Sequence, residues 1–361
     1  MAPKRVAVIG TRGYPSFYGG FETAVRKIVE SDECEDLDFV VFSRKPDCKE
    51  DPKKRNVRVI YTRFLNSSKF STLSHIFFSI NKIKAEKPDV ILAFNVACGF
   101  VLPIFRLWRI PVVLNVDGLE WKRGKWGFAG KAVFFTGAWL SSKLATELIA
   151  DSTNIANYWE EKFGRKCNFI PYGGTPDKSR EDTVGRRPYV IFVARFVPEN
   201  HICEFLEATP FIDPSVDIYI VGKSNGSEYG ARLLSEYSSN DSRIKDLGRV
   251  TSERELNLIW KKSLVYFHGH SVGGTNPALV QAMANACSIV AFDSEFNREV
   301  LEETAVFSTA NPNHIALCLN SLIKDDDLRR RLSDSAYTRA IENYSWSGVC
   351  QAYRSIIFDL V

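Results

Sequence analysis

The chain has 361 residues, of which 45% are hydrophobic, 25% charged and 12% aromatic. This length predicts two domains, and this composition excludes a disordered or fibrous protein. The eight cysteines include no C-x-x-C pair, which argues against a zinc module, and the length argues against a small disulfide-stabilised secreted protein. We therefore expect reduced thiols, no bound metal and a cytoplasmic location.

Hydropathy and charge narrow the class of partner. No signal-peptide pattern opens the chain, and the longest apolar stretch, 90–105, has 16 residues and contains Asn95 and Pro103. A bilayer-spanning helix needs about 20 residues, so we expect no membrane span. Residues 1–185 hold 29 basic and 21 acidic residues, whereas 186–361 hold 18 and 22. This asymmetry indicates an anionic substrate or membrane surface on one side, and no nucleic-acid-binding motif accompanies the dispersed basic residues.

The first half of the chain alternates short β-branched runs with helical stretches. Such unbroken apolar runs are typical of strands buried on both faces of a parallel sheet. They predict a doubly wound α/β domain over residues 1–172, with a helix at 21–31 after a glycine-rich loop. The expected strands are 6–10, 39–43, 57–61, 90–94, 112–116, 148–151 and 168–171.

Residues 173–188 are rich in Gly, Pro and charge, which predicts a linker. A second α/β series follows, and we expect a second Rossmann-like domain at 189–344 and a final helix, at about 345–359, that returns to the first domain. In such folds ligands bind at the carboxyl ends of the strands. The expected strands are 189–193, 216–221, 264–268 and 288–292, and the expected helices are 201–208, 227–238, 253–262 and 277–286.

Two motifs in the first half have both a structural and a functional interpretation. The loop from Gly10 to Glu22 contains four glycines, and a tight turn or an anion site explains it about equally well. Asp36-Leu-Asp38 imitates a metal-binding D-x-D motif, but at the start of a strand we interpret it as a solvated edge. Asp325–Asp327 are expected to be carboxylates at the start of a helix.

The segment 115–126 contains two tryptophans next to Lys and Arg residues, a combination found where proteins contact phosphate or lipid headgroups. An exposed basic loop with packed tryptophans is the alternative. The residues assigned to an acceptor or membrane side are Glu120, Trp121, Lys122, Arg123, Lys125 and Trp126.

The second half carries two candidate anion sites. Arg195 follows an expected strand, where a fixed guanidinium suits a diphosphate. Residues 268–277, His-Gly-His-Ser-Val-Gly-Gly-Thr-Asn-Pro, lead into a helix whose start would bind a second anion.

These motifs, taken in order, resemble glycosyltransferase family 4, which comprises retaining enzymes of the GT-B fold, and more closely its rhamnosyltransferase-like branch. They are Ile9-Gly-Thr-Arg-Gly-Tyr-Pro, Tyr18-Gly-Gly-Phe-Glu-Thr, Asn115-Val-Asp-Gly-Leu-Glu-Trp-Lys-Arg, Ile149-Ala-Asp-Ser, Ala194-Arg-Phe-Val-Pro-Glu-Asn, the 268–277 run and Asn297-Arg-Glu-Val-Leu. The resemblance implies two Rossmann-like domains facing each other across a cleft. It also implies a C-terminal domain that binds a nucleotide-diphosphate sugar, UDP- or dTDP-linked, without a metal or another cofactor.

Site residues follow from the same resemblance. It implies catalytic roles for Asp117, Arg195 and Asn276, with Asp117 on the acceptor side. It implies donor contacts from Gly19, Gly20, Arg195, Lys223, Arg249, Val250, His270, Gly273, Gly274, Thr275, Asn276 and Gln281.

Two positions depart from the family pattern. Asn200 stands where the family has Lys, so Lys223 or Arg249 would have to supply that charge. Gln281 replaces a carboxylate that holds the ribose hydroxyls, and a neutral amide binds such hydroxyls less strongly. On this interpretation Gln281→Glu should tighten donor binding by about 1 kcal/mol.

The function expected from the resemblance is transfer of a hexose, plausibly rhamnose, to a glycan or lipid-linked oligosaccharide, with retention of configuration, in a cytoplasmic protein peripheral to the membrane. Two alternatives remain open. One is a non-catalytic sugar-nucleotide-binding paralogue that acts as a partner subunit, and the other is a sugar-nucleotide epimerase on the same fold.

Overall fold

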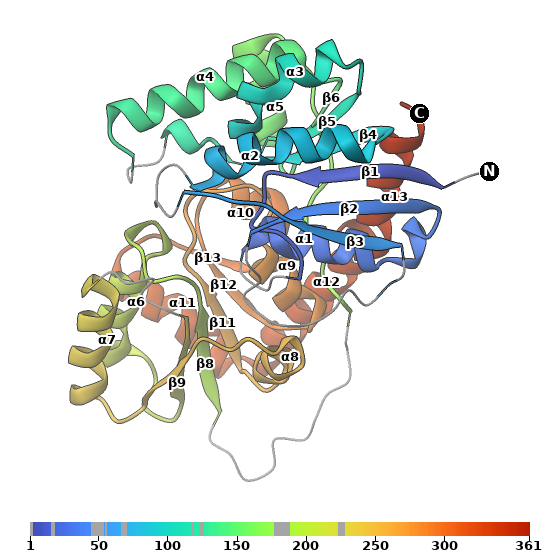
Figure 1. Cartoon of the computed structure of the whole chain (residues 1–361). Helices are drawn as coiled ribbons and strands as arrows, with labels where there is room; N and C mark the ends of the chain where they lie inside the picture. The colour runs from blue at the N-terminus through green and yellow to red at the C-terminus, as the bar shows by residue number, and fades with distance from the viewer. Residues whose placement is uncertain are drawn as a thin grey trace. The chain divides into compact units, whose positions relative to one another are not determined.

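A computed structural model of the chain describes residues 3–15, 19–44, 54, 56–65, 71–116, 118–122, 126–176, 188–222 and 228–361. The chain divides into two compact units (Figure 1). Unit 1 comprises residues 1–172 and 346–361, and unit 2 comprises residues 173–345. Most of the expected linker, 177–187, lies outside the described residues.

Unit 1 is built on a parallel sheet with the order β3-β2-β1-β4-β5-β6-β7 among the described residues. The central strands β4 and β5 are fully buried and β1 is buried from Val6 onward, because nearly all of these side chains are apolar on both faces. The strands are β1 (Lys4–Ile9), β2 (Leu37–Ser43), β3 (Val57–Tyr61), β4 (Val90–Phe94), β5 (Val112–Asn115), β6 (Glu147–Ala150) and β7 (Asn168–Phe169).

The helices of unit 1 lie between these strands in the chain, as a parallel sheet requires, except for the last, which joins the unit from the end of the chain. They are α1 (Gly20–Glu30), α2 (Ser71–Glu86), α3 (Leu102–Leu107), α4 (Phe128–Leu144), α5 (Thr153–Phe163) and α13 (Trp346–Phe358), with the 3₁₀ turns Asp32–Cys34, Val96–Val101 and Glu120–Lys122.

The last helix, α13, packs within unit 1. Its side chains Cys350, Tyr353 and Ile357 are buried. The Tyr353 hydroxyl accepts a hydrogen bond from Asn115 Nδ2 at 2.8 Å, and the Arg354 guanidinium binds both carboxylate oxygens of Asp36. Asp36 is exposed at the start of β2, as the interpretation of a solvated edge predicts, and its carboxylate in addition fixes α13 to that edge.

Unit 2 is built on a second parallel sheet, with the order β10-β9-β8-β11-β12-β13 among the described residues. The order reverses between β8 and β11, which makes their carboxyl ends a topological switch point. The strands are β8 (Tyr189–Val193), β9 (Asp217–Val221), β10 (Ile244–Gly248), β11 (Val265–His268), β12 (Ile289–Phe292) and β13 (Val306–Ser308).

The core of unit 2 contains stacked aromatic rings. Phe192 and Phe267 lie on adjacent strands, and both stack on Phe205 from a helix, with centroids 5.2 and 5.0 Å away. The helices are α6 (Ile202–Ala208), α7 (Glu228–Asn240), α8 (Glu253–Lys261), α9 (Pro277–Ala284), α10 (Glu295–Leu301), α11 (Pro312–Lys324) and α12 (Asp326–Asn343), with the 3₁₀ turns Pro198–Asn200 and Thr209–Phe211.

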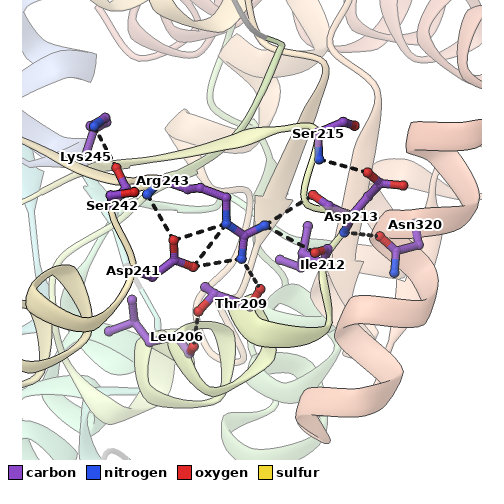
Figure 2. Close-up of polar contacts among 10 residues, drawn as sticks. All are labelled: Leu206, Thr209, Ile212, Asp213, Ser215, Asp241, Ser242, Arg243, Lys245 and Asn320. Carbon is purple, nitrogen blue, oxygen red and sulfur yellow. Dashed lines mark hydrogen bonds and ion pairs between the residues drawn. The ribbon is translucent and has the colours of Figure 1, made fainter.

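Arg243 is a structural cation in unit 2 (Figure 2). Its guanidinium pairs with Asp241 at 2.7 Å and donates hydrogen bonds to the carbonyl oxygens of Thr209, Ile212 and Asp213 at 2.8–3.2 Å. These bonds join the turn before β10 to the segment that follows α6. Because its donors are used internally, Arg243 does not serve as a ligand-binding arginine.

The sequence did not predict β10 and β13. The residues of β10, Ile-Lys-Asp-Leu-Gly, are mostly exposed at the edge of the sheet, so their pattern lacks an apolar run. The predicted carboxylates before α12 are confirmed: Asp325 is the N-cap and accepts a hydrogen bond from the Leu328 N–H at 2.9 Å.

Candidate functional site

The two candidate anion sites of unit 2 follow neighbouring strands at the switch point. Arg195 follows β8, and the 269–276 loop follows β11, which pairs with β8. Hydrogen bonds from Ser271 and His201 join these loops. The Ser271 N–H donates to the Glu199 carbonyl at 3.0 Å, and His201 Nδ1 lies 2.6 Å from the Gly269 carbonyl. The fold therefore brings together two motifs that lie about 75 residues apart in sequence, at the place where open α/β sheets bind ligands.

Arg195 is exposed, and its guanidinium makes no hydrogen bond or ion pair with the residues that the structure describes. Its carbonyl accepts a hydrogen bond from Asn200 Nδ2 at 2.9 Å. Asn200 is itself buried. The amide that replaces the family's Lys thus holds the backbone of the Arg195 loop, and the Arg195 side chain remains available to a ligand.

The glycine turn before α9 has the features of an anion-binding helix start. Gly273 has a φ of 118°, which a residue with a side chain rarely adopts, and open space lies where its Cβ would be. Thr275 is buried, and Gly274 lies between them. Asn276 is the N-cap of α9, where its Oδ1 accepts from the Ala278 N–H at 2.9 Å, and Pro277 occupies the first turn. Asn276 therefore also has a capping role that the sequence did not predict.

Two buried aromatic residues at the end of β11, Tyr266 and His268, have a supporting role that the sequence analysis missed. His268 is fully buried, lies 2.8 Å from the Tyr266 hydroxyl through Nδ1, and stacks on His270 with centroids 4.4 Å apart. Burial lowers the pKa of His268 well below its usual value, and the neighbouring His270 lowers it further, so His268 is neutral at pH 7. His268 thus supports the ring of His270, a predicted donor contact.

Asn297 fixes the same loop from α10. Its Nδ2 donates to the carbonyl oxygens of His270 and Phe292, both at 2.8 Å, and the residue is buried. The Asn297-Arg-Glu-Val-Leu motif therefore positions the site without reaching it. Asn is the residue expected for this role because a buried amide can satisfy two carbonyl groups.

Gln281 differs from the sequence-based interpretation. Its Oε1 accepts from the Thr175 N–H at 2.9 Å, and its Nε2 donates to the Thr175 carbonyl at 3.1 Å. Next to this pair, the Gly174 N–H donates to the Tyr344 carbonyl at 2.7 Å, and a Cβ at Gly174 would lie 2.7 Å from the Val280 carbonyl. The amide therefore binds the segment that enters unit 2. This contact provides a structural reason for Gln at a position where the family has a carboxylate.

The other donor-side residues of unit 2 lie at the carboxyl ends of β9 and β10. Arg249 is exposed and Val250 is half-buried. They directly follow Gly248, whose carbonyl accepts a hydrogen bond from the Gly222 N–H at 2.9 Å and so joins the ends of β9 and β10. Lys223 lies outside the described residues. Arg249 thus remains the described residue that could supply the charge missing at position 200.

In unit 1, Gly19 and Gly20 stand at the start of α1. A Cβ at Gly20 would lie 3.0 Å from the Tyr172 hydroxyl, so a side chain there would displace Tyr172. Glu22 is buried, and its Oε1 accepts from the Arg12 N–H at 2.9 Å. Burial raises the pKa of Glu22 despite that hydrogen bond. The glycine-rich loop is therefore partly held by the chain's own carboxylate.

The acceptor-side motif is largely packed rather than exposed, and Asp117, Arg123 and Lys125 lie outside the described residues. Trp121 is buried among Phe135, Tyr158, Trp159 and Phe163, so its placement at a membrane surface is corrected.

Three further residues of that motif also have partners within unit 1. Glu120 is also buried and accepts a hydrogen bond from Trp126 Nε1 at 2.9 Å. Lys122 is exposed, with its ammonium 4.1 Å from the centre of the Tyr158 ring.

Within the described ranges, no group of three or more His, Cys, Asp or Glu side chains could hold a metal ion. The seven cysteines that the structure describes form no disulfide with one another. No helix in the described part of the chain is both long and apolar enough to cross a membrane.

Comparison with known proteins agrees with this geometry. Residues 175–339 match the family described as glycosyl transferases group 1, and residues 3–175 match a domain of unknown function, DUF1972. An uncharacterized glycosyltransferase of Methanocaldococcus jannaschii is 24% identical, and the match covers 96% of this chain and 98% of that protein.

Solved structures show the same fold. A sucrose-phosphate synthase of Thermosynechococcus elongatus has a TM-score of 0.80 at 17% identity and covers 99% of this chain and 100% of its own. HepE of Anabaena, solved in complex with UDP, has a TM-score of 0.77 at 15% identity, covering 99% of this chain and all of its own. The predicted fold class, two Rossmann-like α/β units of the GT-B type, is confirmed, and residues 175–339 are similar to glycosyl transferases group 1 domains.

Proposed function

We propose that this protein is a glycosyltransferase that moves a hexose, with rhamnose as the proposed sugar, from a nucleotide-diphosphate sugar to a glycan or lipid-linked oligosaccharide, with retention of configuration. The observation that carries the proposal is the position of Arg195 and of the 273–276 turn on neighbouring loops at the switch point of unit 2. A nucleotide diphosphate needs such paired cationic and backbone N–H groups. HepE, which has the same fold, was solved with UDP and with UDP-glucose.

The chemistry follows from the charge that develops on the leaving diphosphate. The exposed guanidinium of Arg195 can form two parallel hydrogen bonds to phosphate oxygens. The N-terminus of α9 adds partial positive charge, and the cap at Asn276 holds that terminus in place. Stabilising the leaving group lowers the barrier without a metal ion while the acceptor hydroxyl attacks from the same face of the sugar. Asp117 is proposed as the polar group on the acceptor side.

We assign the proposed peripheral contact with an anionic membrane at the cytoplasmic face to α4, because Trp121 is buried. Phe128 and Trp139 are exposed on this helix at 91 and 50%, and their spacing of 11 residues places them on one face, whereas Phe135 packs partly on Trp121. Lys131 and Lys143 flank them, and the helix contains no acidic residue. Aromatic side chains with flanking lysines are typical of helices that lie in a membrane interface.

The test is turnover with a panel of UDP- and dTDP-sugars, with release of the nucleotide diphosphate measured with and without a lipid-linked glycan acceptor. Acceptor-dependent release, and an anomeric configuration retained in the product by NMR, would support the proposal. Arg195→Ala should abolish most of the release. The matched control is Arg331→Ala on the exposed face of α12, which should release diphosphate at the native rate.

A second candidate is the non-catalytic paralogue, which binds a sugar nucleotide and acts as a partner subunit. The engagement of Gln281 with Thr175 favours it, because that amide is occupied within the chain. Binding of a nucleotide sugar with no release under any acceptor condition would select this candidate. Interconversion of the free nucleotide sugar without an acceptor would select an epimerase.

A further inference from the structure

Polar groups from three elements of unit 1 meet at the carboxyl edge of β1 and β2. Arg12 lies in the loop after β1, Arg44 directly follows β2, and Ser71 and Thr72 begin α2. The Arg44 N–H donates to the Arg12 carbonyl at 2.9 Å, so the two loops are joined. The carboxyl edge of a parallel sheet is where α/β domains bind ligands, and none of these residues belongs to the donor site of unit 2.

Arg44 is held in a fixed orientation with donors left over. Its Nη1 donates to the Ser71 hydroxyl at 3.2 Å and its Nη2 to the Thr72 hydroxyl at 2.7 Å. The guanidinium also lies 5.6 Å from the centre of the Phe64 ring. Its Nε is buried and has no hydrogen-bond partner among the described residues. An arginine carries five N–H donors, and a buried unsatisfied one costs free energy unless a partner completes it.

His75, one turn into α2, adds two more unsatisfied atoms. The residue is fully buried, and among the described residues its ring lies near the Ser43 backbone but neither ring nitrogen makes a hydrogen bond of normal geometry. Burial, together with the smaller effect of the Arg44 charge, lowers the pKa of His75 to about 4. The ring is therefore neutral at pH 7, with one donor and one acceptor nitrogen. Orphaned buried polar atoms concentrated in one corner point to a missing polar partner.

The charge of this corner is positive. The backbone hydrogen bond between Arg44 and Arg12 brings two arginines to the same edge, and burial together with the charge of Arg12 lowers the pKa of Arg44. Glu22 is the acidic side chain that interacts with both, and burial raises its own pKa. The first turn of α2 contains no acidic residue, so its partial positive charge is not compensated there.

We propose that Arg44, with Arg12 and the start of α2, forms a binding site for a phosphoryl group. Convergent donors from a guanidinium, hydroxyls and a helix N-terminus suit a tetrahedral anion with several acceptor oxygens. We further assign this phosphoryl group to the acceptor, and this second step rests on the proposed function. The phosphoryl group could belong to a soluble phosphate ester or to a lipid phosphate, which share the chemistry that the site recognises.

The experiment measures phosphate binding in an Arg195→Ala background, so that the donor site of unit 2 does not contribute. Inorganic phosphate and detergent-solubilised farnesyl phosphate are titrated at constant ionic strength, and the thermal shift gives each dissociation constant. Arg44→Gln should weaken both by about tenfold or more, as expected for hydrogen bonds to a charged group. The matched control is Arg109→Gln, an exposed arginine of unit 1, which should change neither constant by more than about twofold.

Three outcomes overturn the phosphoryl site: no phosphate-dependent shift, a shift that Arg44→Gln leaves unchanged, or equal losses in Arg44→Gln and Arg109→Gln. Because Arg44→Gln could disturb folding, Arg44→Lys provides a second test. It keeps the charge but cannot bridge Ser71 and Thr72, so binding should weaken by a smaller factor while the protein melts as the background does. If farnesyl phosphate binds more tightly than inorganic phosphate and both depend equally on Arg44, the phosphoryl group belongs to a lipid. If the two affinities are equal, the site recognises the phosphate group alone.

UDP binding to the protein with native Arg195 separates this proposal from the proposed function. Arg44→Gln should leave the UDP dissociation constant unchanged. If UDP fails to bind but phosphate still binds through Arg44, the glycosyltransferase proposal fails and the phosphoryl site stands.

Discussion

Replacing Gln281 by Glu tests the role of this residue. In the native chain the amide makes two hydrogen bonds with the Thr175 backbone, accepting at 2.9 Å and donating at 3.1 Å. A carboxylate retains the first and loses the second, which costs about 0.5–1.5 kcal/mol. It also places a negatively charged oxygen beside the Thr175 carbonyl oxygen. We therefore expect Gln281→Glu to lower the free energy of unfolding by about 1–2 kcal/mol at pH 7.

The pH dependence of this effect identifies its cause. The Thr175 carbonyl disfavours the charged carboxylate, so the pKa of the introduced carboxyl group should be higher in the folded variant than in the unfolded chain. A protonated carboxyl can donate to the carbonyl as the amide does. The variant should consequently recover stability relative to the native protein as the pH falls from 7 towards 4, and lose it as the pH rises. Urea unfolding at several pH values measures this difference.

Gln351→Glu is the matched control, because Gln351 is exposed on α13 and undergoes the same chemical change. The Gln351 amide also interacts with the Glu33 carboxylate, but Gln351 is exposed and Glu33 only half-buried, so solvent screens their repulsion in the variant. The change should therefore alter stability by no more than about 0.5 kcal/mol in this pH range. Calorimetry with UDP provides the decisive comparison, and we expect Gln281→Glu not to tighten binding. A variant as stable as Gln351→Glu that binds UDP about fivefold more tightly would refute our reasoning and return Gln281 to the ribose site.

Four further predictions concern other parts of the protein. Arg195→Ala should weaken UDP binding by about 1.5–3 kcal/mol by calorimetry and leave the melting temperature unchanged, because its guanidinium has no partner among the described residues; an unchanged dissociation constant would remove it from the site. Transfer activity should survive EDTA, since Arg354 occupies Asp36 of the D-x-D motif; strict dependence on Mg²⁺ or Mn²⁺ would contradict the proposed mechanism. The pKa of His75 falls from 6.5 to about 4 on folding. The native protein should therefore lose about 3 kcal/mol of stability as the pH falls from 6.5 to 4, because the unfolded chain binds a proton that the folded chain does not. His75→Gln should not show this loss in acid unfolding. Arg243→Lys should destabilise unit 2 by about 2–3 kcal/mol in urea unfolding, compared with little change for Arg331→Lys, because lysine cannot reach Asp241 and three carbonyl groups together.

The sequence by itself determined the parts of this protein that depend on local pattern. Unbroken apolar runs predicted the buried strands β1, β4, β8 and β11, since a strand covered on both faces needs apolar side chains throughout. Residues that follow such strands lie at the carboxyl edge of the sheet, so the positions of Arg195 and of the glycine turn could be predicted as well. The cap at Asp325 followed from the residue type alone.

The tertiary structure decided everything that depends on a distant partner. Trp121 looks like an interfacial tryptophan in sequence, but four aromatic side chains from α4 and α5 enclose it, and the exposed rings lie on α4. Gln281 has a partner 106 residues away. The unsatisfied nitrogens of Arg44 and His75 exist only because packing removes water from both side chains. A periodic pattern reports which face of an element is buried; it contains no information about which remote atom completes a hydrogen bond, because chain folding sets that pairing.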